Sequence, residues 1–501
     1  MLRKIRILLA AVTFTLITLL FLDLTGSLHA WLGWLAKIQF WPAVLAMNVA
    51  VVAGLLILTL IFGRIYCSVI CPLGILQDLI SALHSRTKRN RFSFSPEHRW
   101  LRYGVLIVFL ASCVAGINVI VSLLAPYSSY GRMVNSIVRP IWTAGNNVLA
   151  SIAERIDSYA FYSVDVWMRS LPTLIIAAVT FVIIAVLAWR GGRTYCNTIC
   201  PVGTILSFFA RFSWFKISID GDKCVSCRLC EKNCKASAID VKTGQIDYNR
   251  CVVCGNCIDK CHKSAIRYVH PNKAVARKTE NGHDTSHEDK GIDNGRRSFL
   301  LGAAIATTAA ALAQEKKKVD GGLAVIEDKV QPERATPIPP PGSRSARHMA
   351  QHCTACQLCV SACPNDVLRP SSDLSKLMQP TMSYERGYCR PECTRCSEVC
   401  PAGAIKPITR EEKSSTQIGH AVWIKKNCVS VTDGVSCGNC ARHCPVGAIT
   451  MIPLHPGTDS KITIPAVNEA RCIGCGACEN LCPARPFSAI YVEGHEVHRT
   501  V

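Results

Sequence analysis

The chain has 501 residues, enough for several domains, and is strongly basic, with 56 lysines and arginines against 35 aspartates and glutamates and a formal net charge of +21. This charge does not indicate nucleic-acid binding, because much of it lies in short segments beside apolar stretches, and no zinc finger, basic zipper or aromatic-rich RNA motif is present. The 29 cysteines include no Cys-x-x-Cys-His motif, which argues against covalently attached haem.

Residues 1–215 contain four apolar stretches long enough to cross a bilayer as helices. They are Ile7–Leu22, Pro42–Phe62, Tyr103–Leu124 and Leu171–Trp189. A basic N-terminus precedes the first stretch, but no convincing cleavage site follows it, so we expect a retained helix and not a signal peptide. The basic segment Arg86–Arg102 predicts that it and the N-terminus are cytoplasmic, with the loops Asp23–Trp41 and Pro126–Arg169 in the periplasm. The alternative is a buried bundle in a water-soluble protein, which fits stretches of this length poorly.

The pattern Gly-Arg-x-Tyr-Cys-x-x-x-Cys-Pro-x-Gly occurs twice, at Gly63–Gly74 and Gly192–Gly203. Two thiols one helical turn apart in each copy predict a convergence of four cysteines. These are Cys67, Cys71, Cys196 and Cys200. They would hold a metal or an iron–sulfur cluster, or form a redox-active thiol set near a quinone. The alternative is a helix-ending motif whose thiols pack as small apolar groups, as we expect for the isolated Cys113.

The other 24 cysteines form six runs of four, and each run ends in Cys-x3-Cys. Four runs have the spacing Cys-x2-Cys-x2-Cys-x3-Cys, and two have a first gap of three or eight residues. Three thiolates on a tight loop with a fourth from a partner segment are typical of [4Fe–4S] clusters, so the runs predict six of them. Zinc sites usually show two Cys-x-x-Cys pairs with a longer spacer, and disulfide frameworks belong to short secreted chains. Both alternatives therefore fit poorly.

Sequences such as Cys400-Pro-Ala-Gly-Ala-Ile and Cys444-Pro-Val-Gly-Ala-Ile resemble bacterial-type ferredoxins. In that family the fourth cysteine of one run binds the cluster of the neighbouring run. The resemblance implies six ligand sets, labelled sites I to VI. Sites I and II comprise Cys224, Cys227, Cys230 with Cys261, and Cys251, Cys254, Cys257 with Cys234. Sites III and IV comprise Cys353, Cys356, Cys359 with Cys400, and Cys389, Cys393, Cys396 with Cys363. Sites V and VI comprise Cys472, Cys475, Cys478 with Cys444, and Cys428, Cys437, Cys440 with Cys482.

These runs predict a cytoplasmic two-cluster ferredoxin at 216–270 and a four-cluster ferredoxin domain at 346–501. Residues 271–295 are polar and typical of a linker, and 314–345 form a proline-rich linker. Between them, residues 296–313 begin with Arg296-Arg297-Ser298-Phe299-Leu300 and continue as an apolar run, which is the pattern of a twin-arginine signal or a fifth span. Since clusters are built in the cytoplasm, such a signal would carry residues 346–501 to the periplasm already folded. Cleavage after Ala313 would then separate the two halves.

The paired Cys-x3-Cys-Pro motifs resemble the NapH-type membrane subunit of quinol dehydrogenases, and residues 346–501 resemble the NapG/MauM type of periplasmic ferredoxin. The resemblance implies both subunits fused in one chain of the bacterial inner membrane: a membrane α-helical bundle of four spans, with or without a fifth, followed by α+β ferredoxin domains. It implies electron transfer from quinol to a periplasmic reductase or cytochrome, with nitrate reductase as the first candidate. NosR- and CcoG-like proteins share the motif, so the alternative is a factor supplying electrons for metal-cofactor assembly or maintenance. A wholly cytoplasmic polyferredoxin scaffold is a third reading.

Several charged residues are candidates for a role in this chemistry. Asp23, His29 and Lys37 lie at the edge of the first loop, where they would serve as quinone ligands or proton acceptors, although an interfacial role is the simpler reading. Other charges lie near the cysteine runs, where they would shift cluster potentials unless they are solvated surface residues. These are Lys235, His262, Arg267, Arg395, Arg442 and His443.

Overall fold

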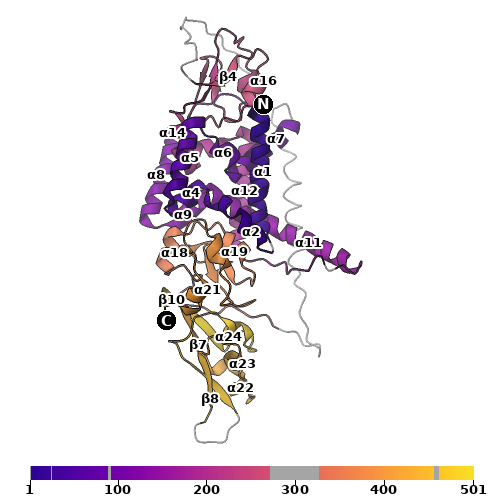
Figure 1. The fold of residues 1–501 in the computed structure, drawn as a ribbon, viewed down its shortest axis with the longest axis vertical. Coiled ribbons are helices and arrows are strands. Elements are labelled where there is room, and N and C mark those ends of the chain that lie inside the picture. Colours follow the sequence, from indigo (N-terminus) through magenta and orange to yellow (C-terminus); the bar gives the residue numbers. More distant parts are fainter. Residues whose placement is uncertain are drawn as a thin grey trace.

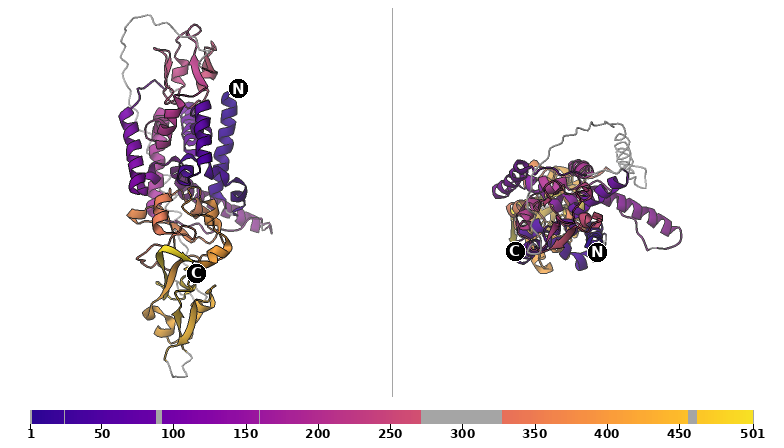
Figure 2. Two further views of the ribbon diagram at one scale, coloured as in Figure 1. Left: turned by 60° about the vertical axis from the view of Figure 1, so that its left-hand side comes forward. Right: turned by 90° about the horizontal axis from the view of Figure 1, so that it is seen from above.

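The computed structural model describes residues 2–23, 25–87, 92–158, 160–270, 327–455 and 462–500. The molecule is elongated, with a helical body in the middle and smaller α/β units at both ends (Figure 1). Residues 216–270 lie at the end of the body that carries the N-terminus, and residues 327–500 extend from the opposite end (Figures 1 and 2). The predicted linker at 271–295 and the twin-arginine-like segment at 296–313 lie outside the described residues.

Two helices of the body are long and apolar enough to cross a membrane. They are α1 (Leu2–Leu22) and α12 (Leu171–Gly191), of 21 residues each, and both coincide with predicted spans. Only 33% of the apolar window of α1 and 22% of that of α12 are buried inside the protein. A core helix of a water-soluble protein would bury most of such a window, so this exposure favours contact with lipid.

The other two predicted spans are interrupted, so the bundle of four spans is not confirmed. The second divides into α4 (Phe40–Leu45) and α5 (Val49–Phe62) around Met47, which has a φ of 53°. The third divides at Gly116, with a φ of 75°, into α8 (Arg99–Ala115) and α9 (Asn118–Leu124). With 14 and 17 residues, α5 and α8 are shorter than the roughly 20 residues that a helical span needs.

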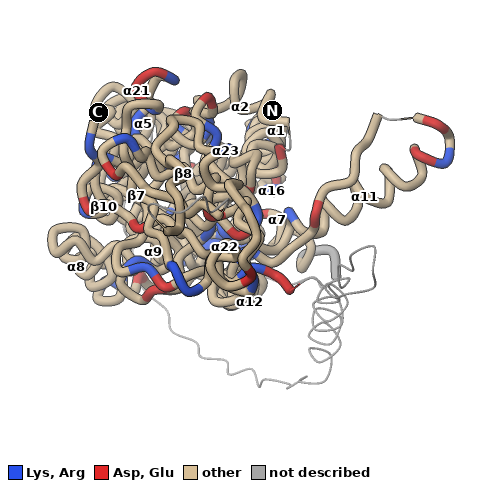
Figure 3. Tube along the Cα trace, turned by 90° about the horizontal axis from the view of Figure 1, so that it is seen from below, with Lys and Arg blue, Asp and Glu red and all other residues tan. Residues whose placement is uncertain are grey.

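The segments predicted as periplasmic loops contain further helices. Between α1 and α4 lie α2 (Ser27–Leu32) and α3 (Trp34–Lys37). Between α9 and α12 lie α10 (Pro126–Met133), the π-helix η1 (Val134–Val138) and α11 (Arg139–Glu154). Every residue of α10 is buried, so this segment is an internal element and not a surface loop. Helix α11, in contrast, projects away from the body (Figure 3).

Both copies of the Cys-x3-Cys-Pro pattern fold in the same way. A one-turn helix carries the first cysteine, and the proline after the second cysteine begins a longer helix, where its missing N–H costs nothing. The first copy forms α6 (Tyr66–Val69) and α7 (Pro72–Thr87). The second copy forms α13 (Thr194–Thr198) and α14 (Pro201–Ala210).

The units at the two ends are α+β ferredoxin folds with two-stranded antiparallel sheets. In residues 216–270, β1 (Lys216–Ile219) pairs with β4 (Ile266–Val269), β2 (Ile239–Asp240) pairs with β3 (Gln245–Ile246), and the short helices are α15 (Leu229–Lys232) and α16 (Asn256–Lys260). The C-terminal part contains the helices α18 (Ala346–His352), α19 (Leu358–Ala362), α20 (Arg395–Val399), α21 (Arg410–Ser415), α22 (Val429–Thr432), α23 (Asn439–Arg442) and α24 (Ala477–Leu481). Its strand pairs are β5 (Leu368–Pro370) with β6 (Pro380–Met382), β7 (Thr416–Trp423) with β10 (Ile490–Thr500), and β8 (Ile449–Pro453) with β9 (Thr463–Val467).

One apolar core continues from the helical body into the units at both ends. It includes Phe21 and Phe109 in the body, Ile239 in the first ferredoxin unit and Leu358 in the C-terminal part. Within the predicted proline-rich linker, Ile338 and residues 339–343 are buried, and the Ile338 carbonyl accepts the N–H of Met382 at 2.9 Å. The end of that segment therefore packs as part of the C-terminal fold. A second, smaller core surrounds sites V and VI.

Candidate iron–sulfur and thiol sites

The four regular cysteine runs share one loop geometry. In site II, Val253 and Gly255 have φ values of 50° and 75°, on either side of Cys254. The same two positions have positive φ in the other regular runs, at Ser226 and Arg228, Ala355 and Gln357, and Gly474 and Gly476. Left-handed residues at alternate positions turn successive N–H groups into the loop and create a concavity that suits an anion. A [4Fe–4S] cluster with four thiolates is such an anion, so these loops fit the group that the spacing predicts.

The fourth cysteine of each of five runs accepts a backbone N–H on its sulfur. The donors to Cys234, Cys261 and Cys444 are the N–H groups four residues later, at 3.4, 3.3 and 3.2 Å. Cys400 and Cys482 accept from Ile405 at 3.5 Å and from Ala489 at 3.3 Å. Such donors stabilise negative charge on sulfur and tune a bound cluster, so this arrangement favours thiolate ligands.

The thiols gather across neighbouring runs. In sites II to VI the structure places the fourth cysteine within electrostatic range of cysteines from the neighbouring run. In sites II and III these are Cys234 with Cys251, Cys254 and Cys257, and Cys400 with Cys353, Cys356 and Cys359. In sites IV, V and VI they are Cys363 with Cys389 and Cys396, Cys444 with Cys472 and Cys475, and Cys482 with Cys440. In site I, Cys230 lies near Cys224 and Cys227. This crossing of the fourth cysteines is the arrangement that the ferredoxin resemblance implies.

Burial opposes ionisation of these thiols. It raises the pKa of Cys234 and Cys356 to about 11, and that of Cys251 and Cys475 to about 12. Thiolate ligation therefore requires cationic iron to displace the protons. Among the described residues, no three His, Cys, Asp or Glu side chains are grouped to hold a single metal ion.

Sites III to VI follow one another away from the helical body. Cys359 of site III lies within electrostatic range of Cys396 of site IV. The Cys389 N–H donates to the Cys475 carbonyl at 2.9 Å, which joins site IV to site V. Cys478 of site V lies near Cys440 of site VI. The four sites therefore form a continuous series along the C-terminal part.

The four thiols of the repeated pattern also meet. Cys67, Cys71, Cys196 and Cys200 are each 4% exposed, and every pair among them interacts electrostatically. The arginines of the two copies cross: Arg64 Nη2 donates to the Cys196 carbonyl at 3.1 Å, and Arg193 Nη1 donates to the Cys67 carbonyl at 2.5 Å. The predicted convergence of the two copies is thus present as an approximate two-fold arrangement.

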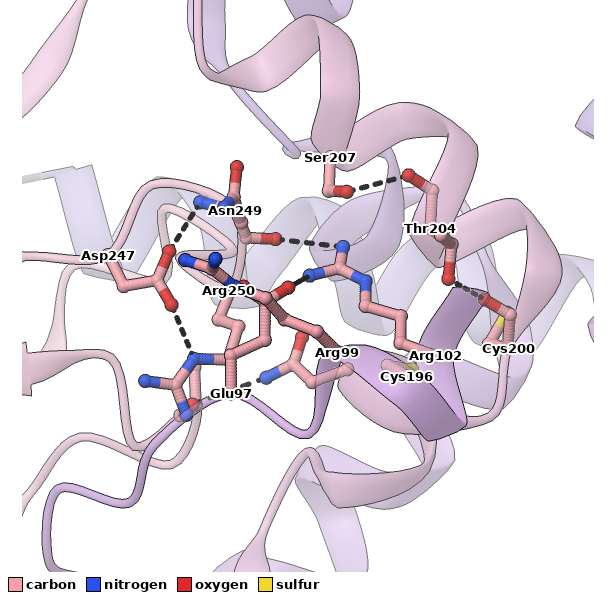
Figure 4. A network of polar contacts seen from close by, with 12 residues as sticks. Glu97, Arg99, Arg102, Cys196, Cys200, Thr204, Ser207, Asp247, Asn249 and Arg250 are labelled. Atoms are coloured by element: carbon pink, nitrogen blue, oxygen red, sulfur yellow. Dashed lines mark hydrogen bonds and ion pairs between the residues drawn. The ribbon is translucent and has the colours of Figure 1, made fainter. Parts of the chain in front are cut away.

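The first ferredoxin unit docks directly onto this thiol site. Arg64 Nη1 donates to the Asn249 carbonyl at 2.7 Å, and Arg102 from α8 donates to the same carbonyl at 3.3 Å, beside Cys196 and Cys200 (Figure 4). The N–H of Arg193 donates to the Lys235 carbonyl at 2.8 Å. Site II therefore lies next to the four thiols.

A buried carboxylate on α7 joins the body to the ferredoxin unit. Asp78 pairs with Arg193 and Lys235 at 2.6 Å each and with Arg6 at 2.9 Å. Lys235 is thus a buried structural cation and not a solvated one, whereas His262, Arg267, Arg442 and His443 are exposed. Asp78 could not be singled out from the sequence, because a single aspartate in an amphipathic helix is ordinary.

Helix α10 separates the four thiols from site III, and the sequence did not indicate it. Gly131 packs so closely against the Cys356 carbonyl that an added Cβ would lie 2.4 Å from the oxygen. The buried Tyr127 hydroxyl lies within electrostatic range of Cys356 and Cys400. Arg132 is fully buried and interacts electrostatically with Tyr195 on one side and Cys356 on the other. Its guanidinium donates to the Ser122 carbonyl and the Ser129 hydroxyl. This helix is therefore the contact between the thiol site and site III.

Of the three candidate quinone ligands, two form a buried pair. His29 Nδ1 lies 3.0 Å from Asp23 Oδ2, and the carboxylate also accepts N–H groups from Gly26 at 2.8 Å and Leu28 at 3.0 Å. The other ring nitrogen of His29 is buried and has no partner among the described residues. Burial lowers the pKa of His29, so the ring is neutral near pH 7. Lys37 is exposed and takes no part in this pair.

Comparisons with known proteins agree with iron–sulfur sites. A family model described as a 4Fe-4S binding domain matches residues 44–91 and 171–220, and one described as a 4Fe-4S dicluster domain matches residues 352–404 and 435–485. The methylamine utilization ferredoxin-type protein MauM of Methylobacillus flagellatus is 30% identical over 166 residues, which cover 32% of this chain and 70% of MauM. The ferredoxin-type protein NapF of Escherichia coli K12 is 31% identical over 159 residues, which cover 32% of this chain and 87% of NapF. An uncharacterized protein of Methanocaldococcus jannaschii is 25% identical over 219 residues, 42% of this chain and 68% of that protein.

Proposed function

The chain belongs to the family of ferredoxin-type iron–sulfur proteins that includes MauM and NapF, and from this we propose that it is a membrane-bound quinol dehydrogenase. Its iron–sulfur domains transfer electrons, as the family does. In the proposal, quinol is the electron donor, six [4Fe–4S] clusters occupy sites I to VI, and the acceptor is a periplasmic reductase or cytochrome, such as one of a nitrate-reductase-like system.

The observation that carries the proposal is the separation of the two ferredoxin parts by the helical body. Near its first residue, α1 contacts the first ferredoxin unit through Arg3, which pairs with Asp259 at 3.0 Å. At its other end, Phe21 packs beside Gly131, next to site III. A helix of 21 residues is about 32 Å long, which matches the roughly 30 Å of a bilayer's hydrocarbon core. The two ferredoxin parts thus stand one membrane thickness apart.

This spacing supports placing the protein in the bacterial inner membrane. Sites I and II would lie in the cytoplasm, beside the basic N-terminus, and sites III to VI in the periplasm. The segment 296–313 would supply the export of the C-terminal part. A periplasmic position of site VI, the last of the series, would allow it to reach a periplasmic acceptor.

Quinol oxidation releases two electrons and two protons, so the site needs a proton acceptor as well as a cluster. The Asp23–His29 pair supplies a proton acceptor. Asp23 accepts the Nδ1–H of His29, and the buried Nε2 then carries a lone pair that can accept a quinol proton. Arg395, next to Cys396 of site IV, lies within electrostatic range of His29. The proton acceptor thus lies beside the C-terminal sites.

Bound clusters would supply one-electron acceptance and donation, and the chain's own residues do the rest. The loop N–H groups and the buried cations stabilise negative charge, the apolar core excludes water from the thiols, and the Asp23–His29 pair removes a proton. Clusters held by the cysteines of sites III to VI would pass the two electrons on one at a time.

The test is anaerobic reduction of the purified full-length protein in lipid nanodiscs by a reduced quinone, followed by visible absorbance and electron paramagnetic resonance. We expect one quinol to deliver two electrons to the clusters. A protein that carries its clusters but is not reduced by any quinol would overturn the proposal, and would favour a factor that delivers electrons for metal-cofactor assembly.

A further inference from the structure

The run of site IV departs from the regular cysteine runs in its first gap. Three residues separate Cys389 from Cys393, whereas the first gap of the regular runs has two. No residue from Cys389 to Cys396, all of which the structure describes, has a positive φ. The loop therefore lacks the two left-handed residues that turn N–H groups inward in the regular runs. Site IV does not form an anion-binding concavity by that geometry.

A buried lysine lies against this loop. Lys413 is 5% exposed, and its Nζ donates to the Arg390 carbonyl at 2.5 Å and to the Cys393 carbonyl. The same ammonium forms a hydrogen bond with the Cys389 side chain. Burial raises the pKa of Cys389, and the Lys413 charge opposes that rise, as expected of a cation that stabilises a thiolate. One cation thus holds both ends of the first gap and reaches a ligand sulfur.

Helix α21 brings Lys413 to the loop from outside the cysteine run. The helix begins with a capping box, in which the Thr409 hydroxyl accepts the Glu412 N–H at 3.2 Å and the Glu412 carboxylate accepts the Thr409 N–H at 2.8 Å. The Glu412 carboxylate is thus bonded at the start of the helix. The groups bonded to Lys413 among the described residues are two carbonyls and a thiol, and none is a carboxylate. Its charge is therefore not offset by an ion pair.

We infer that Lys413 positions the loop of site IV and raises the reduction potential of the cluster that this site binds. The two carbonyl bonds hold the longer first gap in place. A cluster gains one negative charge when it is reduced, so a buried cation beside a ligand sulfur favours the reduced state. Lys413 would thus supply, from a helix, the positive charge that backbone N–H groups supply in the regular loops.

The role of this potential rests on the proposed function, in which quinol gives up two electrons singly. On one side of site IV, Arg395 lies within electrostatic range of His29, the proposed proton acceptor. On the other side, the Cys389 N–H is bonded to the Cys475 carbonyl of site V. A raised potential would favour uptake by site IV of one electron that quinol has released. That electron would then pass to site V, with no bond made or broken and no proton moved.

A redox titration followed by electron paramagnetic resonance tests the inference on the full-length protein, loaded with its clusters anaerobically. The signal of site IV is the one that Cys396→Ser removes. Lys413→Met removes the charge and should lower the equilibrium constant for reduction of site IV about tenfold, which is about 59 mV for one electron. Lys413→Arg keeps the charge and should recover most of this difference. The matched control is Lys426→Met, at an exposed lysine near Cys428, which should leave every potential unchanged.

An unchanged potential of site IV in Lys413→Met overturns the inference, and so does an equal fall in Lys413→Met and Lys413→Arg. If Lys413→Met does not load site IV, the titration uses Lys413→Gln, which keeps an N–H donor without the charge and should show the same tenfold fall. Loss of the site IV signal in both neutral variants, with its retention in Lys413→Arg, supports the need for the charge. Failure of the proposed function is a separate result, because a titration with dithionite does not require that any quinol reduces the protein.

Discussion

Asp78 on α7 is the common partner of three buried cations that come from three parts of the chain. Its side chain is 12% exposed and lies 2.6 Å from Arg193 Nε, 2.6 Å from Lys235 Nζ and 2.9 Å from Arg6 Nη1. Asp78→Asn keeps the shape of the side chain and removes its charge. Removing one partner of a buried ion pair costs about 3–5 kcal/mol. Because Lys235 belongs to the first ferredoxin unit, we expect this cost to weaken its docking on the helical body.

A cost of about 3–5 kcal/mol raises the population of the undocked form by roughly 10²- to 10⁴-fold. Native-state amide hydrogen exchange measures such local opening, so amides of residues 216–270 should lose protection by a similar factor. The matched control is Asp259→Asn, which breaks the ion pair with Arg3. The side chains of Arg3 and Asp259 are 40% and 32% exposed. An exposed pair contributes about 0–1 kcal/mol, so this control should change exchange less than about fivefold.

Equal exchange in Asp78→Asn and Asp259→Asn would refute the reasoning. A double variant sharpens the test, because residues in direct contact are not additive. Asp78→Asn with Lys235→Met removes one of the stranded cations and should recover part of the lost protection. Losses that simply add would show that Lys235 does not depend on Asp78.

Three further changes test other parts of the structure. His29→Gln removes the proton acceptor, so quinol oxidation should slow by about 10²-fold or more while the iron content is unchanged; equal rates would exclude His29 from the site. Arg132→Met removes a fully buried cation beside Cys356, so the reduction potential of site III should fall by on the order of 50 mV in a redox titration. The control Arg442→Met, at an exposed arginine, should change no reduction potential measurably. Burial lowers the pKa of His498 to about 4, so the unfolded chain binds the proton at a higher pH than the folded chain does. The C-terminal part should therefore lose stability as pH falls from about 6.5 to 4. His498→Phe should remove this loss in thermal unfolding measured across that range.

The ferredoxin sites could be predicted because their determinants are local. Spacings such as that of Cys251, Cys254 and Cys257 form one tight loop, and the left-handed residues Val253 and Gly255 lie within the same few positions. The Cys-x3-Cys-Pro copies were also recognisable, since the spacing of their Gly, Arg, Tyr, Cys and Pro residues is the same around Cys67 and Cys196. Their convergence followed from the repeat itself.

The helical body was harder to predict, because its determinants are tertiary. Hydropathy is averaged over a window of many residues, so one residue that breaks a helix hardly changes the mean. The helix breaks at Met47 and Gly116 are therefore not visible in the hydropathy of their apolar stretches. Helix α10 has a polar sequence, Pro-Tyr-Ser-Ser-Tyr-Gly-Arg-Met, which is typical of a loop. Some of its polar groups are bonded within the body: Arg132 donates to the Ser122 carbonyl and the Ser129 hydroxyl, and the Ser129 hydroxyl donates to the Leu123 carbonyl. No periodic pattern in the sequence predicts these hydrogen bonds.

The helical body also buries arginines that no local sequence pattern predicts to be buried. Arg64 and Arg132 are fully buried and form no ion pair with a carboxylate among the described residues, and burying unpaired charge is costly. Clusters bound at the neighbouring sulfur sites would supply negative charge that offsets these cations, so the fold of the body and the loading of its clusters are expected to depend on each other.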